Sequence, residues 1–137
     1  MYKELTTFEI ALRRRKERMP DLSMVPKTFY LMPLPEKYKK GIEAFLKLQI
    51  IIDAVNNDDP SLPEWKPDYD NVNQSKWFPA YVGKSTNDGF KFNGAKKNWV
   101  QIIDGGGSRL ALKDQDRCHH MDEHFRDLYK ALYMISE

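Results

Sequence analysis

The last third of the chain constrains the fold most strongly. Residues 114–135 carry apolar side chains at spacings of three and four, which gives a helix with one apolar stripe. That stripe consists of Cys118, Met121, Phe125, Leu128, Leu132 and Ile135. A helix of this kind needs an apolar surface to cover, and residues 77–112 supply candidates for the strands of a sheet. We therefore expect helix 114–135 to pack on a sheet.

The candidate strands are short and separated by turn signals. The first contains Pro79, which predicts an edge strand or a bulge. Asn87-Asp88-Gly89 favours a hairpin turn, because these residues tolerate the positive backbone angles of such turns. The candidates are residues 77–82, 90–92, 99–103 and 109–112. The expected sheet is antiparallel and has three or four strands.

A second long helix is expected over residues 35–56. Pro35 suits its first turn, and Asn56-Asn57-Asp58-Asp59-Pro60 ends it. Apolar residues occupy so much of its circumference that it should be covered on two sides. The expected class is α+β, with helices of about 35–56 and 114–135 on one face of the sheet. The core should contain Phe45, Ile52, Phe78, Phe90, Phe92, Leu110, Leu112, Phe125, Leu128 and Leu132.

Residues 1–34 are expected to form an N-terminal arm, and residues 35–137 a single α+β domain. Thr6-x-x-Glu9 resembles a capping box and predicts a short helix that ends near Arg18. The segment Leu22–Met32 is rich in proline and apolar residues, so we expect it to lie across the body or a partner.

Positive charge is concentrated in the first 18 residues. Six basic and three acidic side chains there give +3, which leaves −1 for the rest of a chain whose net charge is +2. Such clusters bind phosphate backbones or acidic proteins, or else form a solvated helix face. The candidate binding residues are Arg13, Arg14, Arg15, Lys16 and Arg18.

Two further motifs carry possible chemistry. Gly105-Gly106-Gly107-Ser108-Arg109 could offer backbone amides and the Arg109 guanidinium to an anion, although a turn before a strand is the favoured interpretation. His120 and His124 share one helix face, but no second cluster of ligands accompanies them. We therefore expect no metal and no cofactor. No nucleophile, base and acid can be grouped, so no catalytic residue is predicted and the question of enzyme activity stays open.

The residue types also indicate a compartment. A single cysteine, Cys118, cannot form an internal disulfide, which favours a reducing environment. The longest apolar run, residues 46–55, contains Lys47 and Asp53 and is too short and polar to span a bilayer. The expected location is the cytoplasm, with no membrane partner.

Five motifs in order resemble a family of small uncharacterised proteins from phages and prophages of Bacteroidetes bacteria. They are Trp65-Lys66-Pro67-Asp68, Trp77-Phe78-Pro79, Gly89-Phe90-Lys91-Phe92, Gly107-Ser108-Arg109-Leu110-x-x-Lys113 and Phe125-x-x-Leu128-Tyr129-Lys130. The resemblance covers about residues 45–135. It implies a mobile element in a bacterial host cell, or a place in the virion, and it implies no activity or catalytic residue.

Three functions are compatible with these features. The first is a non-enzymatic accessory protein that binds a protein partner, or itself, through Leu22–Met32. The second is nucleic-acid binding by the basic arm, and the third is a small hydrolase or nucleotide-handling enzyme with a ligand near residues 105–109.

Overall fold

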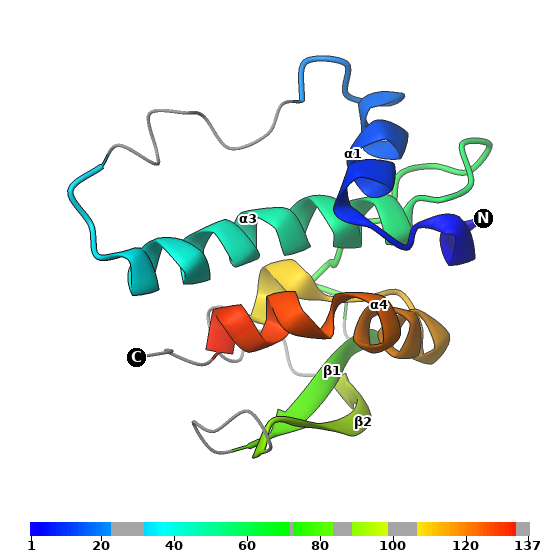
Figure 1. The fold of residues 1–137 in the computed structure, drawn as a ribbon. Coiled ribbons are helices and arrows are strands. Elements are labelled where there is room, and N and C mark those ends of the chain that lie inside the picture. The colour runs from blue at the N-terminus through cyan, green and yellow to red at the C-terminus, as the bar shows by residue number, and fades with distance from the viewer. Residues whose placement is uncertain (23–31, 72, 84–88, 99–106, 134–137) are drawn as a thin grey trace.

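Three α-helices and a two-stranded antiparallel sheet form an α+β fold in the described part of the chain (Figure 1). The computed structural model describes residues 1–22, 32–71, 73–83, 89–98 and 107–133. The elements are the 3₁₀ helix η1 (Tyr2–Glu4), α1 (Phe8–Lys16), α3 (Glu36–Asn56), β1 (Lys76–Val82), β2 (Lys91–Asn98), the 3₁₀ helix η3 (Gly107–Leu110) and α4 (Gln115–Tyr133). In these ranges, no helix combines the length and the apolar character that crossing a bilayer requires.

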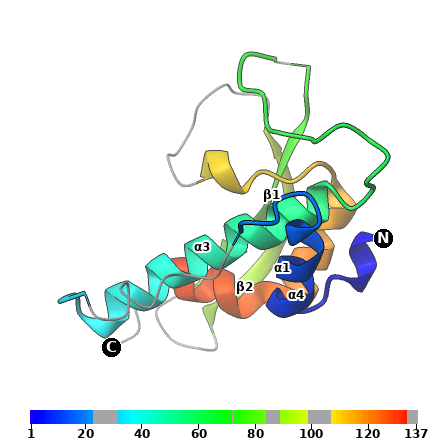
Figure 2. The ribbon, with the colours of Figure 1, turned by 90° about the horizontal axis from the view of Figure 1, so that it is seen from above.

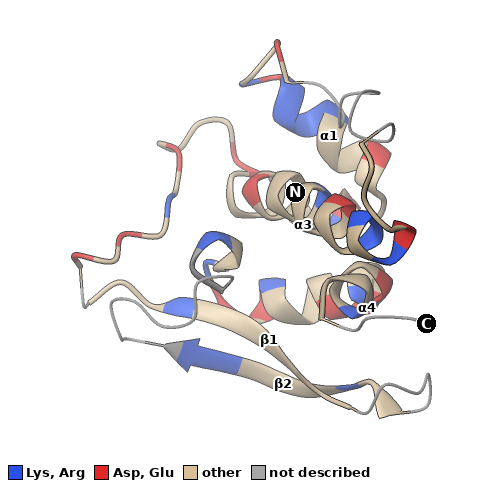
Figure 3. Ribbon diagram, turned by 90° about the vertical axis from the view of Figure 1, so that its left-hand side faces the viewer, with Lys and Arg blue, Asp and Glu red and all other residues tan. Residues whose placement is uncertain are grey.

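The elements are stacked in layers, with α4 between α3 and the β1–β2 ribbon (Figures 1 and 3). α1 lies on the other side of α3 (Figures 1 and 3), and the view from above shows that it lies along the half of α3 that ends at Asn56 (Figure 2). The prediction that α3 is covered on two sides is thereby confirmed. The prediction that α3 and α4 share one face of the sheet is wrong. The buried apolar sides of α3 are covered by α1 and α4, so these sides are not left to pack on the strands. Among the helices, α4 makes the extensive contact with the ribbon.

The ribbon pairs Trp77 with Lys97 and Tyr81 with Phe92. Its register shifts between Pro79 and Tyr81, where the proline predicted an edge strand or a bulge. No third strand is present among the residues that the structure describes. The candidate strand 99–103 and the turn residues 87 and 88 lie outside those residues.

The predicted strand 109–112 is wrong. Residues 107–110 form η3, and Leu112 alone pairs with Trp77, through backbone hydrogen bonds of 3.0 and 2.8 Å. The short 3₁₀ turn buries Leu110, and α3 packs against it. Tertiary packing thus overrides the local preference of this apolar segment for a strand.

The main helices begin close to the predicted residues. α3 runs from Glu36 to Asn56, and α4 begins after Asp114, whose carboxylate accepts a hydrogen bond from the backbone N–H of Arg117 at 2.9 Å. α4 breaks into two segments at Phe125, whose backbone angles are not helical (φ −132°, ψ 20°). The capping box at Thr6 is wrong by one residue.

The N-cap of α1 is Thr7. Its hydroxyl accepts a hydrogen bond from the backbone N–H of Ile10 at 3.3 Å. The pattern residue Glu9 then falls one position too early to complete a capping box.

The core includes residues on both sides of the boundary expected at residue 34. Leu5, Phe8 and Ala11 are buried in the same cluster as the apolar faces of α3 and α4. Of the predicted core residues, Ile52, Phe90, Leu110, Leu112 and Phe125 are buried, and Phe45, Leu128 and Leu132 pack against them.

Phe78 and Phe92 are only partly buried and are not members of this cluster. Side chains alternate along a strand, and Trp77 and Tyr81 take the inward positions of β1. Phe78 therefore lies on the opposite face of the ribbon. Phe92 instead packs against the Tyr81 ring, at 5.7 Å between ring centroids.

Candidate functional site

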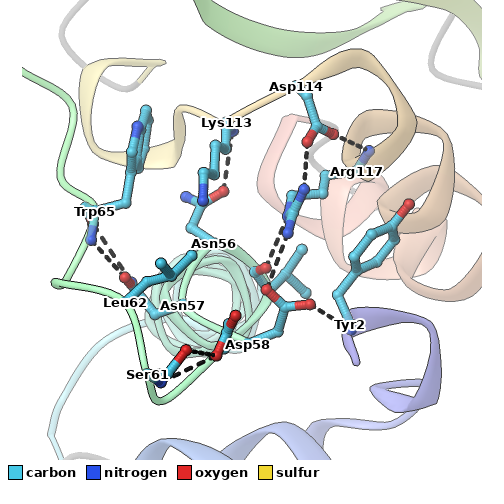
Figure 4. Close-up of polar contacts among 12 residues, drawn as sticks. Tyr2, Asn56, Asn57, Asp58, Ser61, Leu62, Trp65, Lys113, Asp114 and Arg117 are labelled. Atoms are coloured by element: carbon cyan, nitrogen blue, oxygen red, sulfur yellow. Dashed lines mark hydrogen bonds and ion pairs between the residues drawn. The ribbon is translucent and has the colours of Figure 1, made fainter.

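Three consecutive polar residues at the end of α3, residues 56–58, hold several distant segments together (Figure 4). Asn56 donates a hydrogen bond to the carbonyl of Ala111 and accepts one from the backbone N–H of Lys113, both at 3.0 Å. Asn57 accepts a hydrogen bond from the backbone N–H of Trp65 at 2.5 Å. Two adjacent amides thus position the segment after η3 and the loop that follows α3.

Asp58, the next residue, joins the N-terminus to α4 (Figure 4). Its carboxylate accepts hydrogen bonds from the backbone N–H of Tyr2 at 2.7 Å and from Nη2 of Arg117 at 2.9 Å. Arg117 also donates to the carbonyl of Val55 at 2.9 Å and to the carboxylate of Asp114. Its guanidinium lies 4.4 Å from the centre of the Tyr2 ring.

The sequence indicated these residues only as the end of a helix. Consecutive Asn and Asp side chains after a helix were the available signal, but such residues also form ordinary turns. Apart from Trp65 and the Asp53 carbonyl, which Asn57 contacts, their partners are more than 50 residues distant and could not be identified from the sequence. The cluster stabilises the fold and positions the surfaces described below.

Most of the predicted basic cluster on α1 is engaged within the molecule. Arg14 forms an ion pair with Glu4 at 3.1 Å, and Arg18 donates to the carbonyls of Asp59 and Leu62 at 2.7 and 3.3 Å. These contacts fasten α1 to η1 and to the loop after α3. They reduce the number of cations that α1 can offer to a polyanion.

Arg15 is buried, whereas Arg13 and Lys16 are exposed. The side chain of Arg15 is 7% exposed and forms an ion pair with Glu64. The five predicted residues therefore do not form one surface. Arg13 to Lys16 point to different sides of α1, because residues one apart on a helix do not share a face, and Arg18 lies beyond the end of the helix.

Arg15 lines a polar cleft of about 700 Å³, which lies between α1, α3, residues 64–69 and η3. Its charged and polar lining includes Arg15, Gln49, Asp53, Glu64, Lys66 and Arg109, with the rings of Trp65 and Tyr69 beside them. The structure thus brings together two residues, Arg15 and Arg109, that the sequence had proposed for separate sites. Three cations and two carboxylates give this polar cleft a net positive formal charge.

Burial has left polar groups in this cleft incompletely paired. Nε and Nη1 of Arg15 and Oε1 of Gln49 are buried and have no hydrogen-bond partner among the described residues. Burial raises the pKa of Asp53, although Arg15 and a 3.3 Å hydrogen bond from Gln49 oppose that rise. Burial also lowers the pKa of Arg15. Burying these groups without full hydrogen bonding costs free energy, which hydrogen bonds from a bound polar ligand would offset.

A second surface is apolar and lies where the first half of α3 meets the end of α4. This apolar groove, about 370 Å³ in volume, is lined by Lys37, Tyr38, Gly41, Ile42, Phe45, Ala131 and Leu132. A Cβ atom added at Gly41 would lie 3.5 Å from the Ala131 carbonyl oxygen, an ordinary van der Waals contact, so α3 and α4 lie close together at this point. The groove is the shallow depression that remains beside this contact.

The two histidines that share one helix face, and that we considered as metal ligands, have other contacts. A ring nitrogen of His120, Nε2, lies 2.8 Å from the carbonyl oxygen of Leu5 and must carry the proton to donate to it. The His120 and His124 rings are 4.7 Å apart between centroids. Within the described ranges, no group of three or more His, Cys, Asp or Glu side chains is placed to hold a metal ion.

No known protein family, curated protein or solved structure matches this chain. The resemblance of residues 45–135 to phage and prophage proteins therefore remains a prediction.

Proposed function

We propose that this chain is a binding protein without catalytic activity, and that it receives an apolar segment of a protein partner in the groove between α3 and α4. One observation carries the proposal. Tyr38, Ile42 and Leu46 are 49, 42 and 36% exposed and follow one another at intervals of four residues, which aligns them along one side of α3.

This exposed stripe is not needed to hold α3 in place. The second half of the helix supplies its core contacts, through Leu48, Ile51, Ile52 and Val55. Contiguous exposed apolar side chains mark interaction surfaces more often than isolated ones do. Burying each of them against a partner would contribute roughly 25 cal/mol per Å² of apolar area.

The shape of the groove favours a helical or extended segment with apolar anchors spaced along it. Lys37 lies at the groove, so an acidic residue beside the anchors would complement its charge. A role as an accessory protein in a bacterial host agrees with the resemblance to phage and prophage proteins. The sequence also predicts partner binding or self-association through Leu22–Met32, of which residues 23–31 lie outside the described residues.

Affinity capture from nuclease-treated host extract tests this function. The wild-type chain is compared with Ile42→Asp, which places a charge in the groove, and with the control Val82→Asp. Val82 is 51% exposed on β1 and does not line the groove, so both substitutions change an exposed apolar residue to the same acid. We expect one partner to bind the wild type and the control with equal affinity and to bind Ile42→Asp at least tenfold more weakly.

Purification of that partner and titration against the three proteins provide the decisive comparison. Equal binding to all three proteins, or loss of binding in both variants, would contradict the proposal. A shift from dimer to monomer in Ile42→Asp alone, measured by light scattering, would identify a second copy of the chain as the occupant.

Nucleic-acid binding through α1 is the weaker alternative. Its exposed cations are Arg13 and Lys16, because Arg14, Arg15 and Arg18 are engaged as described above. Nuclease treatment separates the two functions, since it would remove a partner that is held through nucleic acid.

A further inference from the structure

The polar cleft has features of a ligand site that the proposed partner binding does not use. It lies between α1, α3, residues 64–69 and η3, whereas the apolar groove lies at the opposite end of α3. A volume of about 700 Å³ falls within the range of small-molecule sites, which is about 300–1,000 Å³.

Arg15 is the central group of this cleft. The contact with Glu64 uses Nη2 only, and Nε and Nη1 remain buried without a partner among the described residues. An unpaired buried donor on a guanidinium loses its hydration without compensation, and oxygen atoms of an anion are its best acceptors. Arg109 and Lys66 line the same cleft and are exposed, so they can turn towards such an anion.

The other residues that line the cleft offer hydrogen-bond acceptors and aromatic rings, which an anion alone would leave without partners. Oε1 of Gln49 is a buried acceptor without a partner in the described part of the chain, and it needs an N–H or O–H group opposite it. Asp53, beside Gln49, is a second acceptor. Trp65 and Tyr69 add aromatic rings on which a planar group can stack.

We infer that the polar cleft binds a nucleoside monophosphate. The phosphate would accept hydrogen bonds from Arg15, Arg109 and Lys66, and the base would stack on an aromatic ring and donate to Gln49 or Asp53. A phosphate dianion can accept hydrogen bonds from all three cations, of which Arg15 is also paired with Glu64, and the exocyclic or ring N–H groups of a base match the two acceptors. The partner proposed for the apolar groove does not enter this inference.

Isothermal titration of the full chain with the four ribonucleoside monophosphates tests the inference. The unphosphorylated nucleosides and inorganic phosphate serve as separate probes of the two halves of the ligand. We expect saturable binding of at least one monophosphate, and binding at least tenfold weaker for its nucleoside and for phosphate alone.

Three variants locate the site. Arg109→Gln removes an exposed cation from the cleft, Arg15→Gln removes the buried one, and Arg13→Gln makes the same charge change at an exposed position outside the cleft. We expect about a tenfold loss of affinity in Arg109→Gln and a larger loss in Arg15→Gln, with no change in Arg13→Gln. Arg15→Gln also breaks the ion pair with Glu64 and could prevent folding. In that case the affinity of Arg109→Gln decides the test.

Several results would overturn the inference. These are the absence of saturable binding at millimolar monophosphate, equal affinity for a nucleoside and its monophosphate, and equal weakening in Arg109→Gln and Arg13→Gln. None of them bears on the Ile42→Asp comparison, so the two proposals fail separately.

Discussion

Arg117 shows how much a single partly buried polar side chain contributes to this fold. It contacts the end of α3 through Val55, the following loop through Asp58, and the N-terminal segment through the ring of Tyr2. Such a residue is stabilising because each of its three guanidinium nitrogen atoms donates a hydrogen bond, since a desolvated charge without partners is costly. Arg15 makes the contrast clear, because two of its three nitrogen atoms are buried without a partner among the described residues. The comparison of these two arginines is the main reason to associate Arg15 with a ligand and Arg117 with the fold.

His120 predicts a pH dependence of stability. Burial lowers the pKa of His120 below its ordinary value of 6.5, and the hydrogen bond to the Leu5 carbonyl opposes that change only in part. His124 and Arg117 lower this pKa further, and Glu123 raises it. The unfolded chain therefore binds more protons than the folded chain just below pH 6.5, so the free energy of unfolding should fall as pH drops through that value. The fall should end below the pKa of the folded state.

Chemical denaturation from pH 8 to pH 5 measures this effect in the wild type, His120→Gln and His119→Gln. Glutamine at position 120 can still donate to Leu5 but does not titrate. We expect His120→Gln to lose less stability on acidification than the wild type does, and the control at the exposed His119 to behave as the wild type does. Identical pH profiles for the wild type and His120→Gln would contradict the assignment.

At the scale of elements, the fold depends on how α3 ends. Asn56 is the last residue of α3, in the turn where a helix leaves its final carbonyls without partners inside the helix. Its side chain hydrogen-bonds to the Ala111 carbonyl and the Lys113 N–H, which lie on either side of Leu112 between η3 and α4. This contact substitutes for strand pairing along residues 111–113, where only Leu112 pairs with β1. A side chain of α3 thus completes the edge of the ribbon and orients the start of α4.

Replacing Asn56 with alanine should be strongly destabilising. The substitution leaves the buried Ala111 carbonyl and the partly buried Lys113 N–H without partners, which costs about 2–4 kcal/mol for the two groups together. Urea denaturation measures the free energy of unfolding, and Asn93→Ala, at an exposed position of β2, is the matched control, with an expected change within about 0.5 kcal/mol. Similar values for the two variants would show that the Asn56 amide has little role in the fold.

At the scale of the whole molecule, the N-terminal segment belongs to the core. Leu5 and Ala11 are fully buried and Phe8 is 8% exposed, and all three pack with α3 and α4. α1 is only nine residues long and could not be stable alone. Its stability therefore comes from docking, as does the shielding of α3 from water on that side.

A chain that begins at residue 19 should lose cooperative folding. Removal of Leu5 and Phe8 alone forfeits about 3–6 kcal/mol of burial, a large part of the roughly 5–15 kcal/mol that stabilises a domain. Calorimetry of residues 19–137 should show a broad or absent transition, and addition of a peptide of residues 1–22 in excess should restore a sharp one. A truncated chain with the wild-type Tm would instead establish residues 1–34 as an independent arm.

The sequence alone determined the features that depend on neighbouring residues. The starts of α3 and α4, the end of α3, strand β1 and the irregularity at Pro79 follow from local periodicity, capping and proline chemistry, which act within a few residues. β2 was predicted only in part, because it continues to Asn98, beyond the expected strand 90–92. Tertiary structure decided the rest: the stacking of α3 on α4, the conversion of residues 107–110 to η3, the burial of Arg15, and its meeting with Arg109 in one cleft. These outcomes depend on which apolar faces and polar groups meet across 50 or more residues, because burial and hydrogen-bond satisfaction are properties of the packed whole and not of any local segment.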